Sequence, residues 1–335
     1  MRKYLFPKGF PFYKANLHCH STESDGQFTP EEIKEAYKAK GYSVIAYTDH
    51  EVMVPHPELD DPDFLALNGY ETEIMDDYPL DSSFKFRKTC HICLIALEPD
   101  NLRQVYWTNV YVTPMLRQKH PKLVEQYKDT PDTKRVFSGE GISDLMETAR
   151  KNGFFVTYNH PYWSLADFSM LSQYHGMHAL EIYNHGCATG GFDEYDPALM
   201  DAMLRNNQRV HFVAADDNHG ERSQFGGFTM ICAEKLEYRS VTKALEDGHF
   251  YASTGPEIKE LWFEDGNVHI RCSPAERIVA SFGIRKKVCI RKTDTDLIEA
   301  VIPVDKEDIY VRVTVWDEDG KHADTNAYFT DALFE

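Results

Sequence analysis

Three histidines follow directly after short apolar segments that have the length and composition of strands. They are His50 after residues 43–48, His160 after residues 154–158, and His219 after residues 210–215. In folds of alternating strands and helices, functional side chains gather at the carboxyl ends of the strands. Imidazole nitrogen is a common ligand of first-row divalent ions. The three positions therefore predict a metal site at one end of a sheet.

An H-x-H pair near the N-terminus adds two more candidate ligands. In an extended segment, residues two apart point to the same side and lie roughly 6–7 Å apart. His18 and His20 can therefore hold one cation between them, while Cys19 points away. Asp25 lies in a Ser- and Gly-containing loop that can fold back and offer an oxygen ligand to a neighbouring ion. The pair alone is a weak signal, but it is persuasive together with the histidines at the strand ends.

Two further positions supply an acid and a histidine. Glu71 ends a short apolar run, and a bidentate or bridging carboxylate is what a site with several cations needs. His91 opens a predicted strand over residues 92–97. Taken singly, each residue has a purely structural alternative, because an isolated acid after Gly-Tyr is usually a solvated turn residue.

The elements that position these residues repeat the order strand, polar loop, capped helix and glycine up to about residue 250. The predicted helices span residues 30–40, 143–152 and 197–206. The first begins with Thr29-Pro30 and two glutamates, which is typical of a helix start with a capping box. This alternation predicts an α/β fold with a largely parallel sheet.

The pattern changes after about residue 255. Five apolar segments separated by turn signals predict strands at residues 258–263, 268–272, 278–284, 297–301 and 310–316. We therefore expect two domains, residues 1–255 with the candidate ligands and a small β-sandwich-like domain at residues 256–335. Residues 98–140 interrupt the repeat and predict an insertion with a helix and loops, either a lid or packing decoration.

Composition limits the class of partner. The 335 residues contain 36 Lys and Arg against 54 Asp and Glu, a formal charge of −18. That sign argues against broad binding to nucleic acid or to anionic membranes. No apolar run approaches a membrane span, no signal peptide is visible, and the 7 cysteines do not suit a disulfide framework. We expect a cytoplasmic protein with no membrane partner, and the oligomeric state stays open.

In chain order, these motifs resemble the PHP (polymerase and histidinol phosphatase) family. The matching pieces are the H-x-H with its Ser-Thr-Glu-Ser-Asp-Gly tail, T-D-H, Gly-x-Glu, the strand histidine, N-H-P and D-x-H. Residues 222–256 resemble the carbaryl-hydrolase-like branch through Gly-Phe-Thr, Ala-Leu-Glu-Asp-Gly and Tyr-Ala-Ser-Thr-Gly-Pro. The resemblance covers about residues 14–256. It implies a distorted (β/α)7 barrel with a trinuclear site for Zn, Mn or Fe.

The resemblance also implies how three divalent ions would be shared among the ligands. One ion would take His18, His20, Glu71 and Asp217, a second Glu71, His91 and His160, and a third Asp25, His50 and His219. Glu71 would then bridge two ions. Mixed imidazole and carboxylate ligands suit Zn²⁺, Mn²⁺ or Fe²⁺ better than Ca²⁺ or Mg²⁺.

Three residues next to these ligands are candidates for orienting them. Asp49 and Asn159 directly precede ligand histidines and could hold ring N–H groups or waters. Asp216 could do likewise, because the D-x-H spacing selects Asp217 as the ligand.

The expected activity is hydrolysis of a phosphoester by a hydroxide that bridges two ions. The substrate would be a small anionic phosphorylated metabolite or a nucleotide or oligonucleotide phosphoester, since the ions leave the site net positive. Asp217 and His219 would act in catalysis. Arg222 could clamp a substrate oxygen, with a surface salt bridge as its alternative. Two other functions stay open, a carboxylic or carbamate ester hydrolase and a non-catalytic metal-binding module.

Overall fold

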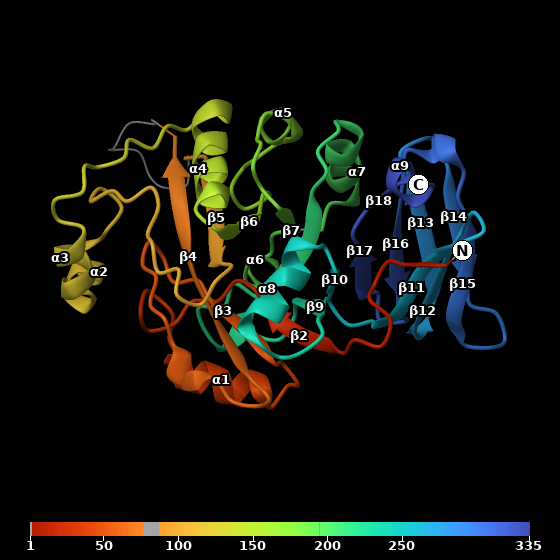
Figure 1. Ribbon diagram of the computed structural model, residues 1–335, viewed down its shortest axis with the longest axis horizontal. Coiled ribbons are helices and arrows are strands. Elements are labelled where there is room, and N and C mark those ends of the chain that lie inside the picture. The colour runs from red at the N-terminus through yellow and green to blue at the C-terminus, as the bar shows by residue number, and fades with distance from the viewer. Residues whose placement is uncertain (1, 77–86, 194) are drawn as a thin grey trace.

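The structure is a computed structural model that describes residues 2–76, 87–193 and 195–335. Its strands form one large mixed sheet and one small sheet. Figure 1 shows helices packed around one half of the molecule, while the half that holds both chain ends is built mainly of strands. None of the described helices is long and apolar enough to cross a membrane.

The large sheet carries most of the chain. Its order is β14-β13-β16-β17-β10-β9-β2-β3-β4-β5-β6-β7-β8, with β18 paired to β16, and the small sheet has the order β1-β11-β12-β15. The strands are β1 (Lys3–Tyr4), β2 (Phe12–Asn16), β3 (Val44–Tyr47), β4 (Leu65–Met75), β5 (Thr89–Ala96), β6 (Phe154–Tyr158), β7 (Ala179–Asn184), β8 (His211–Ala215), β9 (Phe228–Cys232), β10 (Phe250–Ser253), β11 (Ile258–Glu264), β12 (Asn267–Ala275), β13 (Arg277–Phe282), β14 (Lys287–Arg291), β15 (Leu297–Pro303), β16 (Tyr310–Trp316), β17 (His322–Thr325) and β18 (Tyr328–Phe329).

The helices are short and lie mostly between the strands of the first half. They are α1 (Pro30–Lys38), α2 (Pro114–Lys119), α3 (Pro121–Gln126), α4 (Gly139–Lys151), α5 (Phe168–Leu171), α6 (His185–Thr189), α7 (Pro197–Arg205), α8 (Tyr238–Glu246) and α9 (Thr330–Leu333). The capping box expected from Thr29 is present at the start of α1. The helix predicted to begin at residue 143 begins four residues earlier, because Ser138 accepts a hydrogen bond from Gly141 N–H and caps it.

The sheet is mixed rather than largely parallel, which corrects the sequence-based expectation. Strands β2, β3 and β4 are parallel, as are β6, β7 and β8. Strand β5 runs antiparallel to both β4 and β6. Met75 pairs with Thr89, so the chain reverses after β4 and comes back beside it as a hairpin. The short apolar run noted before Glu71 therefore belongs to a longer strand, which continues to Met75.

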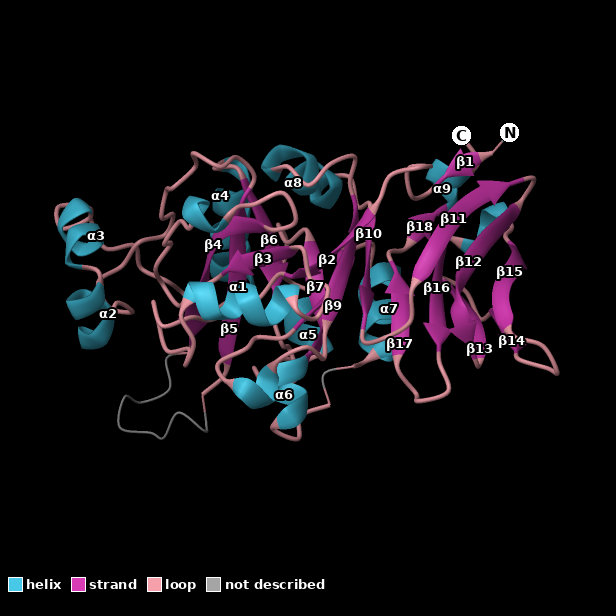
Figure 2. Cartoon of the chain, turned by 90° about the horizontal axis from the view of Figure 1, so that it is seen from below, coloured by secondary structure: helices cyan, strands magenta, loops and turns pink. Residues whose placement is uncertain are grey.

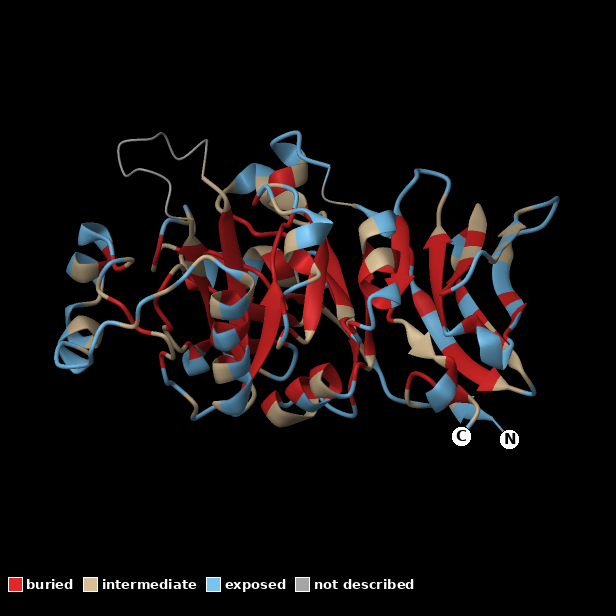
Figure 3. Ribbon diagram, turned by 90° about the horizontal axis from the view of Figure 1, so that it is seen from above, coloured by how far each residue is buried: buried red, intermediate tan, exposed pale blue. Residues whose placement is uncertain are grey.

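The first half of the sheet curves around a common apolar interior. One cluster takes Ala15, Val44, Leu67, Ile95, Phe155, Ala179, Val213 and Ile231 from the eight strands β2 to β9. The other faces of β3 and β6 are buried beneath α1 and α4, so these strands are apolar on both sides (Figure 3).

A closed barrel is not shown. Among the described strands, β8 ends the ladder order of the large sheet. It meets β9 through a side chain, because Thr229 Oγ1 accepts from Ala214 N–H at 3.2 Å and donates to Ala214 O at 3.0 Å. The arrangement is a curved mixed α/β sheet, and the (β/α)7 barrel stays a prediction.

The insertion expected at residues 98–140 holds α2 and α3, at the end of the molecule opposite the C-terminal strands (Figure 2). Trp107, Val112 and Leu116 form a small apolar cluster with Val52, which lies just after His50. The insertion is therefore packed onto a segment of the candidate site.

The C-terminal strands form two layers around a shared apolar core. Ile258 and Val268 from the small sheet meet Ile278 and Val313 from the large sheet in this core. Strand β1 pairs with β11, so the first residues of the chain pack with the C-terminal strands. The division into domains at residue 255 stays a prediction, since β10 pairs with β17 and the large sheet continues across it.

A buried ion pair ties the two halves together. Arg312 Nε on β16 donates to Asp201 Oδ1 on α7 at 2.7 Å, and their side chains are 2% and 9% exposed. Tyr310 OH donates to the same oxygen at 3.1 Å. Burial lowers the pKa of Arg312, but the Asp201 carboxylate outweighs this effect and raises it.

We expect the substitution Arg312→Met to lower the free energy of unfolding by about 3–5 kcal/mol, because it removes the buried partner of Asp201 and leaves this carboxylate with the exposed Lys287, 3.3 Å from its other oxygen, as its cationic partner. Urea denaturation followed by circular dichroism measures this change. The matched control is Arg271→Met, whose pair with Glu260 is half exposed, and its cost should stay below about 1 kcal/mol. Equal costs for the two variants would contradict the assignment.

Candidate metal centre

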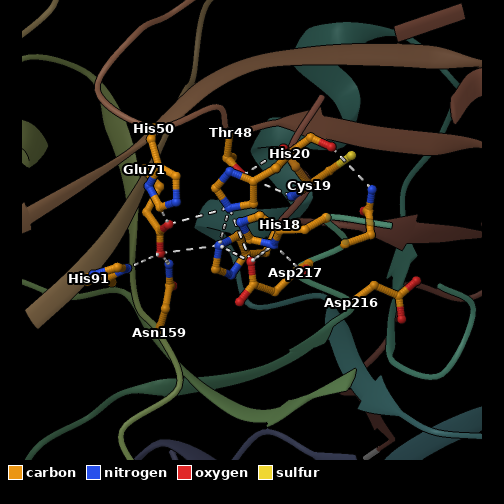
Figure 4. A network of polar contacts seen from close by, with 12 residues as sticks. His18, Cys19, His20, Thr48, His50, Glu71, His91, Asn159, Asp216 and Asp217 are labelled. Atoms are coloured by element: carbon orange, nitrogen blue, oxygen red, sulfur yellow. Dashed lines mark hydrogen bonds and ion pairs between the residues drawn. The ribbon is translucent and has the colours of Figure 1, made fainter. Parts of the chain in front are cut away.

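Glu71 lies at the centre of the nine predicted ligands. Its carboxylate is 1% exposed and accepts contacts from five histidine rings. Nitrogens of His18, His91 and His160 lie 3.2, 3.2 and 3.4 Å from Oε1. Nitrogens of His20 and His50 lie 3.4 and 3.2 Å from Oε2. Each carboxylate oxygen therefore faces its own group of rings, as a bridging ligand requires (Figure 4).

The structure brings all nine residues together, although they come from different parts of the chain. Strand β5 runs opposite to its neighbours. Its first residues, which include His91, therefore lie at the edge where β3, β6 and β8 end. His50 forms an isolated parallel bridge with Glu71, just beyond the end of β3. The expected convergence at the strand ends thus holds for the parallel strands. Glu71 differs, because it lies inside β4 rather than at its end.

The ligand atoms fall into groups that differ from those implied by the resemblance. The groups that could hold an ion include His20 with Asp25, His50 and His219; His18 with His160 and Asp217; and His50 with Glu71 and His91. The ring of His20 lies 4.2 Å from that of His219 and 4.3 Å from that of His50, between ring centroids. His20 therefore lies with the residues expected around the third ion, while its Nε2 is also 3.1 Å from Asp217 Oδ1.

Asp25 is held in place by a tight loop. Gly26 N–H donates to Ser21 O at 2.9 Å, and a Cβ at Gly26 would lie 2.5 Å from the carbonyl oxygen of His20. Only glycine fits at that position. The turn returns Asp25 towards the cluster, where its oxygens lie 3.4 Å from His219 Nε2 and 3.7 Å from His50 Nε2.

Two ligands have backbone conformations that L-residues rarely adopt. His160 has φ 28° and Asp217 has φ 49°. Hydrogen bonds hold both in place, since His160 N–H donates to Glu181 Oε2 at 2.8 Å and Asp217 N–H donates to His18 O at 2.9 Å. Strain of this kind at a cluster of polar side chains is typical of functional sites.

Glu181 is a site residue that the sequence analysis missed. It lies on β7, is 1% exposed, and its Oε1 is 3.1 Å from His18 Nδ1. Its other oxygen accepts from His160 N–H and from Asn184 Nδ2, at 2.8 and 2.9 Å. A carboxylate behind a ligand histidine fixes the ring and its tautomer. His185 directly follows β7 but belongs to none of the candidate ion-binding groups, so only the position of Glu181 on a strand beside β6 and β8 could have indicated it.

The residues expected to orient the ligands act differently from the prediction. Asn159 Nδ2 donates to Glu71 Oε1 at 2.8 Å, so it holds the carboxylate rather than a ring. Asp49 accepts from the backbone and hydroxyl groups of Ser21 and Ser24, which fixes the Asp25 loop. Asp216 points away from the cluster (Figure 4) and accepts from the N–H groups of residues 225–227. Burial raises the pKa of Asp216 to about 6, although these donors oppose the shift.

Neighbouring charges and burial shift the pKa values of the histidines in the cluster in different directions. Burial alone would lower the pKa of His20, but Asp217 and Glu71 outweigh it and raise that pKa to about 10. His91 behaves likewise, with a pKa raised to about 10 mainly by Glu71. Burial and the neighbouring His20 lower the pKa of His50 to about 4. The carboxylates therefore require positive charge nearby, from protonated rings or from bound cations.

The donor set fits divalent ions. Among the described residues, His20 Nδ1, both ring nitrogens of His91 and Asp217 Oδ1 are buried and form no hydrogen bond of good geometry. The His91 nitrogens and Asp217 Oδ1 do have charged neighbours, since they lie 3.2 Å from Glu71, 3.3 Å from Glu73 and 3.1 Å from His20. Buried polar atoms without a good hydrogen bond are costly unless something else satisfies them. Nitrogen and carboxylate oxygen in groups of three or four suit Zn²⁺, Mn²⁺ or Fe²⁺.

A cavity of about 880 Å³ opens onto the cluster. Arg222 lines it from the turn Glu221–Ser223 and is exposed. Within the described ranges, no acid pairs with its guanidinium, so the surface salt bridge considered as an alternative is not seen there. Its role towards a substrate stays a prediction, as do the catalytic roles of Asp217 and His219.

The insertion contributes an ion pair next to the cluster. Arg135 donates to both carboxylate oxygens of Glu51, at 2.6 and 2.7 Å, and to Glu73 O at 2.7 Å. Glu51 follows His50 and has φ 58°, and its N–H donates to Glu71 O at 2.7 Å. The bidentate pair therefore fixes the backbone of two candidate ligands.

No family model matches the chain. A DNA polymerase/3'-5' exonuclease PolX of Bacillus subtilis (strain 168) is 25% identical over 166 residues, which covers 44% of this chain. The chain spans only 29% of the length of that relative.

Two solved structures match this chain in backbone arrangement with TM-scores below 0.5. A two-domain protein from Bacteroides vulgatus, containing a predicted PHP-like metal-dependent phosphoesterase, has a TM-score of 0.44 at 15% identity, over 98% of this chain and 97% of that one. A candidate metal-dependent phosphoesterase from Bifidobacterium adolescentis has a TM-score of 0.37 at 15% identity, over 64% and 91%. These scores transfer no function. Membership of the PHP family and of its carbaryl-hydrolase-like branch therefore stays a prediction.

We expect Glu71→Gln to remove about one equivalent of bound metal or more from protein purified with Mn²⁺ or Zn²⁺, because an amide cannot bridge two cations. Inductively coupled plasma mass spectrometry measures the metal content. Glu234→Gln, at an exposed acid outside the cluster, should keep the full content. An unchanged metal content in Glu71→Gln would exclude a bridging role.

Glu181→Gln should keep the metal ions but weaken their affinity by about 10–100-fold, the usual cost of losing a partner behind a ligand histidine. Isothermal titration calorimetry of metal-free protein with Zn²⁺ gives the affinity. The control is Glu147→Gln, an exposed acid on α4. An affinity within threefold of the unchanged protein would show that Glu181 does not position His18.

Proposed function

We propose that the protein is a metal-dependent phosphoesterase. It hydrolyses a small phosphorylated metabolite or a phosphoester of a nucleotide or oligonucleotide. The observation that carries this proposal is the buried carboxylate of Glu71 among five imidazole rings at the floor of a large cavity. A bridging acid with rings on both oxygens is suited to a site with several cations.

The charges around the cavity support bound cations and an anionic substrate. The floor carries the carboxylates of Asp25, Glu71 and Asp217, and Arg222 is the one Lys or Arg among the lining residues of the described chain. A phosphate would be repelled by this floor alone. Bound divalent ions would reverse the local sign, polarise the ester and lower the pKa of a water molecule towards neutrality.

We propose three ions, with Glu71 bridging two of them. His18, His160 and Asp217 would hold one ion, His50 and His91 a second, and His20, Asp25 and His219 a third, while Glu71 would be shared by the first two. Asn159 and Glu181 would keep the Glu71 carboxylate and the His18 ring in position. Arg222 would bind a non-bridging oxygen of the substrate through its planar pair of N–H groups.

The relative from Bacillus subtilis gives independent support. Its name includes a 3'-5' exonuclease, which is an enzyme that cleaves phosphodiester bonds. The two other expected functions are not favoured by a separate observation. Ester hydrolysis at carbon would use the same cations, and a metal-binding module without catalysis would not need a cavity open to its ligands.

A panel of p-nitrophenyl phosphate, bis-p-nitrophenyl phosphate and p-nitrophenyl acetate with Mn²⁺ tests this proposal. We expect hydrolysis of at least one phosphate ester, and the absorbance of the released p-nitrophenolate measures its rate. His18→Ala and Asp217→Ala should each lower kcat more than about 100-fold, since groups one step further from a metal already cost 10–100-fold.

The matched control is His175→Ala, at an exposed histidine outside the cluster. It should keep the rate of the unchanged protein. Hydrolysis of the acetate alone would favour the carboxylic ester hydrolase. No hydrolysis of any ester, with full metal occupancy, would favour a binding module.

A further inference from the structure

The cavity has two chemically different parts. Its floor is the cluster around Glu71, whereas apolar side chains line two of its walls. Met115 and Leu116 on α2 belong to the wall from the insertion. Trp163, which follows β6, and Phe192, which follows α6, belong to the second wall and come from later segments of the chain. A volume of about 880 Å³ is far larger than a phosphate and is in the range of pockets for drug-sized ligands.

The wall from the insertion is fixed to the floor. Lys119 Nζ donates to Thr22 O and Ser24 O at 2.7 and 2.6 Å, so the end of α2 holds the loop that carries Asp25. His120 Nε2 lies 2.7 Å from Glu23 O in the same loop. Arg135 holds Glu51 from the other end of the insertion. The apolar wall is therefore part of the site in this conformation.

The other apolar wall touches the candidate ligands directly. The ring of Trp163 packs edge-on against His91 and His160, with centroids 5.3 and 4.9 Å apart. Phe192 packs against Tyr162, with centroids 6.1 Å apart. Met115 is 41% exposed and Phe192 is 36% exposed, so both leave apolar surface uncovered at the cavity. Such surface beside a polar floor is suited to binding an apolar group.

We propose that the substrate is a phosphoester whose organic part is aromatic or otherwise apolar. This rests on the proposed function, since the phosphoryl group would lie on the floor and the apolar group between Met115 and Leu116 on one side and Trp163 and Phe192 on the other. For a monoester the reaction is ROPO₃²⁻ + H₂O → ROH + HPO₄²⁻. Water oxygen forms the new P–O bond, the bond from phosphorus to the ester oxygen breaks, and a proton from water ends on the alcohol. A sugar phosphate would leave the apolar walls uncovered.

Two phosphonates that cannot be hydrolysed test this inference by binding alone. Phenylphosphonate and methylphosphonate carry the same anionic head and differ in the apolar group. The full chain is loaded with Mn²⁺ and titrated with each phosphonate by isothermal titration calorimetry. The Kd for phenylphosphonate should be at least about 10-fold lower than that for methylphosphonate, because burying a phenyl ring strengthens binding by more than about tenfold. Kd values within twofold would overturn the inference.

Variants of the walls locate the effect. Met115→Ser and Phe192→Ser change exposed residues without adding charge and should each remove most of the preference for the phenyl group, with methylphosphonate affinity kept. Val110→Ser is the matched control, because Val110 is an 80% exposed residue of the same insertion that does not line the cavity. Two variants on different walls keep the test decisive if one does not fold, which circular dichroism shows. A preference retained in every folded wall variant would overturn the inference.

The outcome separates this inference from the proposed function. Benzyl phosphate and glycerol phosphate have leaving alcohols of similar acidity, so they differ mainly in the apolar group. Hydrolysis of both at equal kcat/KM would leave a phosphoesterase but contradict the apolar pocket, whereas a kcat/KM at least about 10-fold higher for benzyl phosphate would support both. Absence of all phosphatase activity, with phenylphosphonate still bound more tightly than methylphosphonate, would retain the pocket and remove the reaction.

Discussion

The carboxylate of Glu71, buried among five imidazole rings, is the constraint on which the rest of the site depends. A buried carboxylate without compensating charge is unfavourable by several kcal/mol. Here the compensation must come from the rings, as protonated imidazoles, or from cations between them. The nitrogens of His91 and Oδ1 of Asp217 lie near oppositely charged groups but form no hydrogen bond of good geometry, so the side chains alone satisfy each other incompletely. The arrangement is therefore better explained as a cage for cations than as a hydrogen-bonded core.

Holding rings from distant segments around one acid places demands on the backbone. Glu51, His160 and Asp217 all have positive φ, and each such residue costs about 1–3 kcal/mol. The hydrogen bonds that stabilise these conformations come from other parts of the cage, as in the contact of His160 N–H with Glu181. Strain and compensation are thus concentrated in the same few residues. A fold selected for stability alone has no reason to place both there.

The sequence predicted which side chains lie together better than it predicted the strands that carry them. His50, His160 and His219 could be found because short apolar runs precede them, and strand β6 was predicted with its observed bounds. The direction of β5 could not be predicted, since local patterning does not report which way a neighbouring strand runs. Glu181 was missed because its role arises only when β7 lies beside β6. Strand β14 was missed because its apolar run covers only residues 288–290 and lies between basic residues on both sides.

The insertion shows why composition alone could not decide between a lid and decoration. Its basic and apolar residues have two different roles, and each role depends on residues from other segments of the chain. Arg135 pairs with Glu51 and Lys119 binds the Asp25 loop, so the charged residues connect the insertion to the cage. Met115 and Leu116 face the cavity that this attachment leaves open. Because the same segment both supports the ligands and forms a wall, a change in its sequence would alter ligand geometry and substrate preference together. An insertion that merely covered the sheet would alter neither.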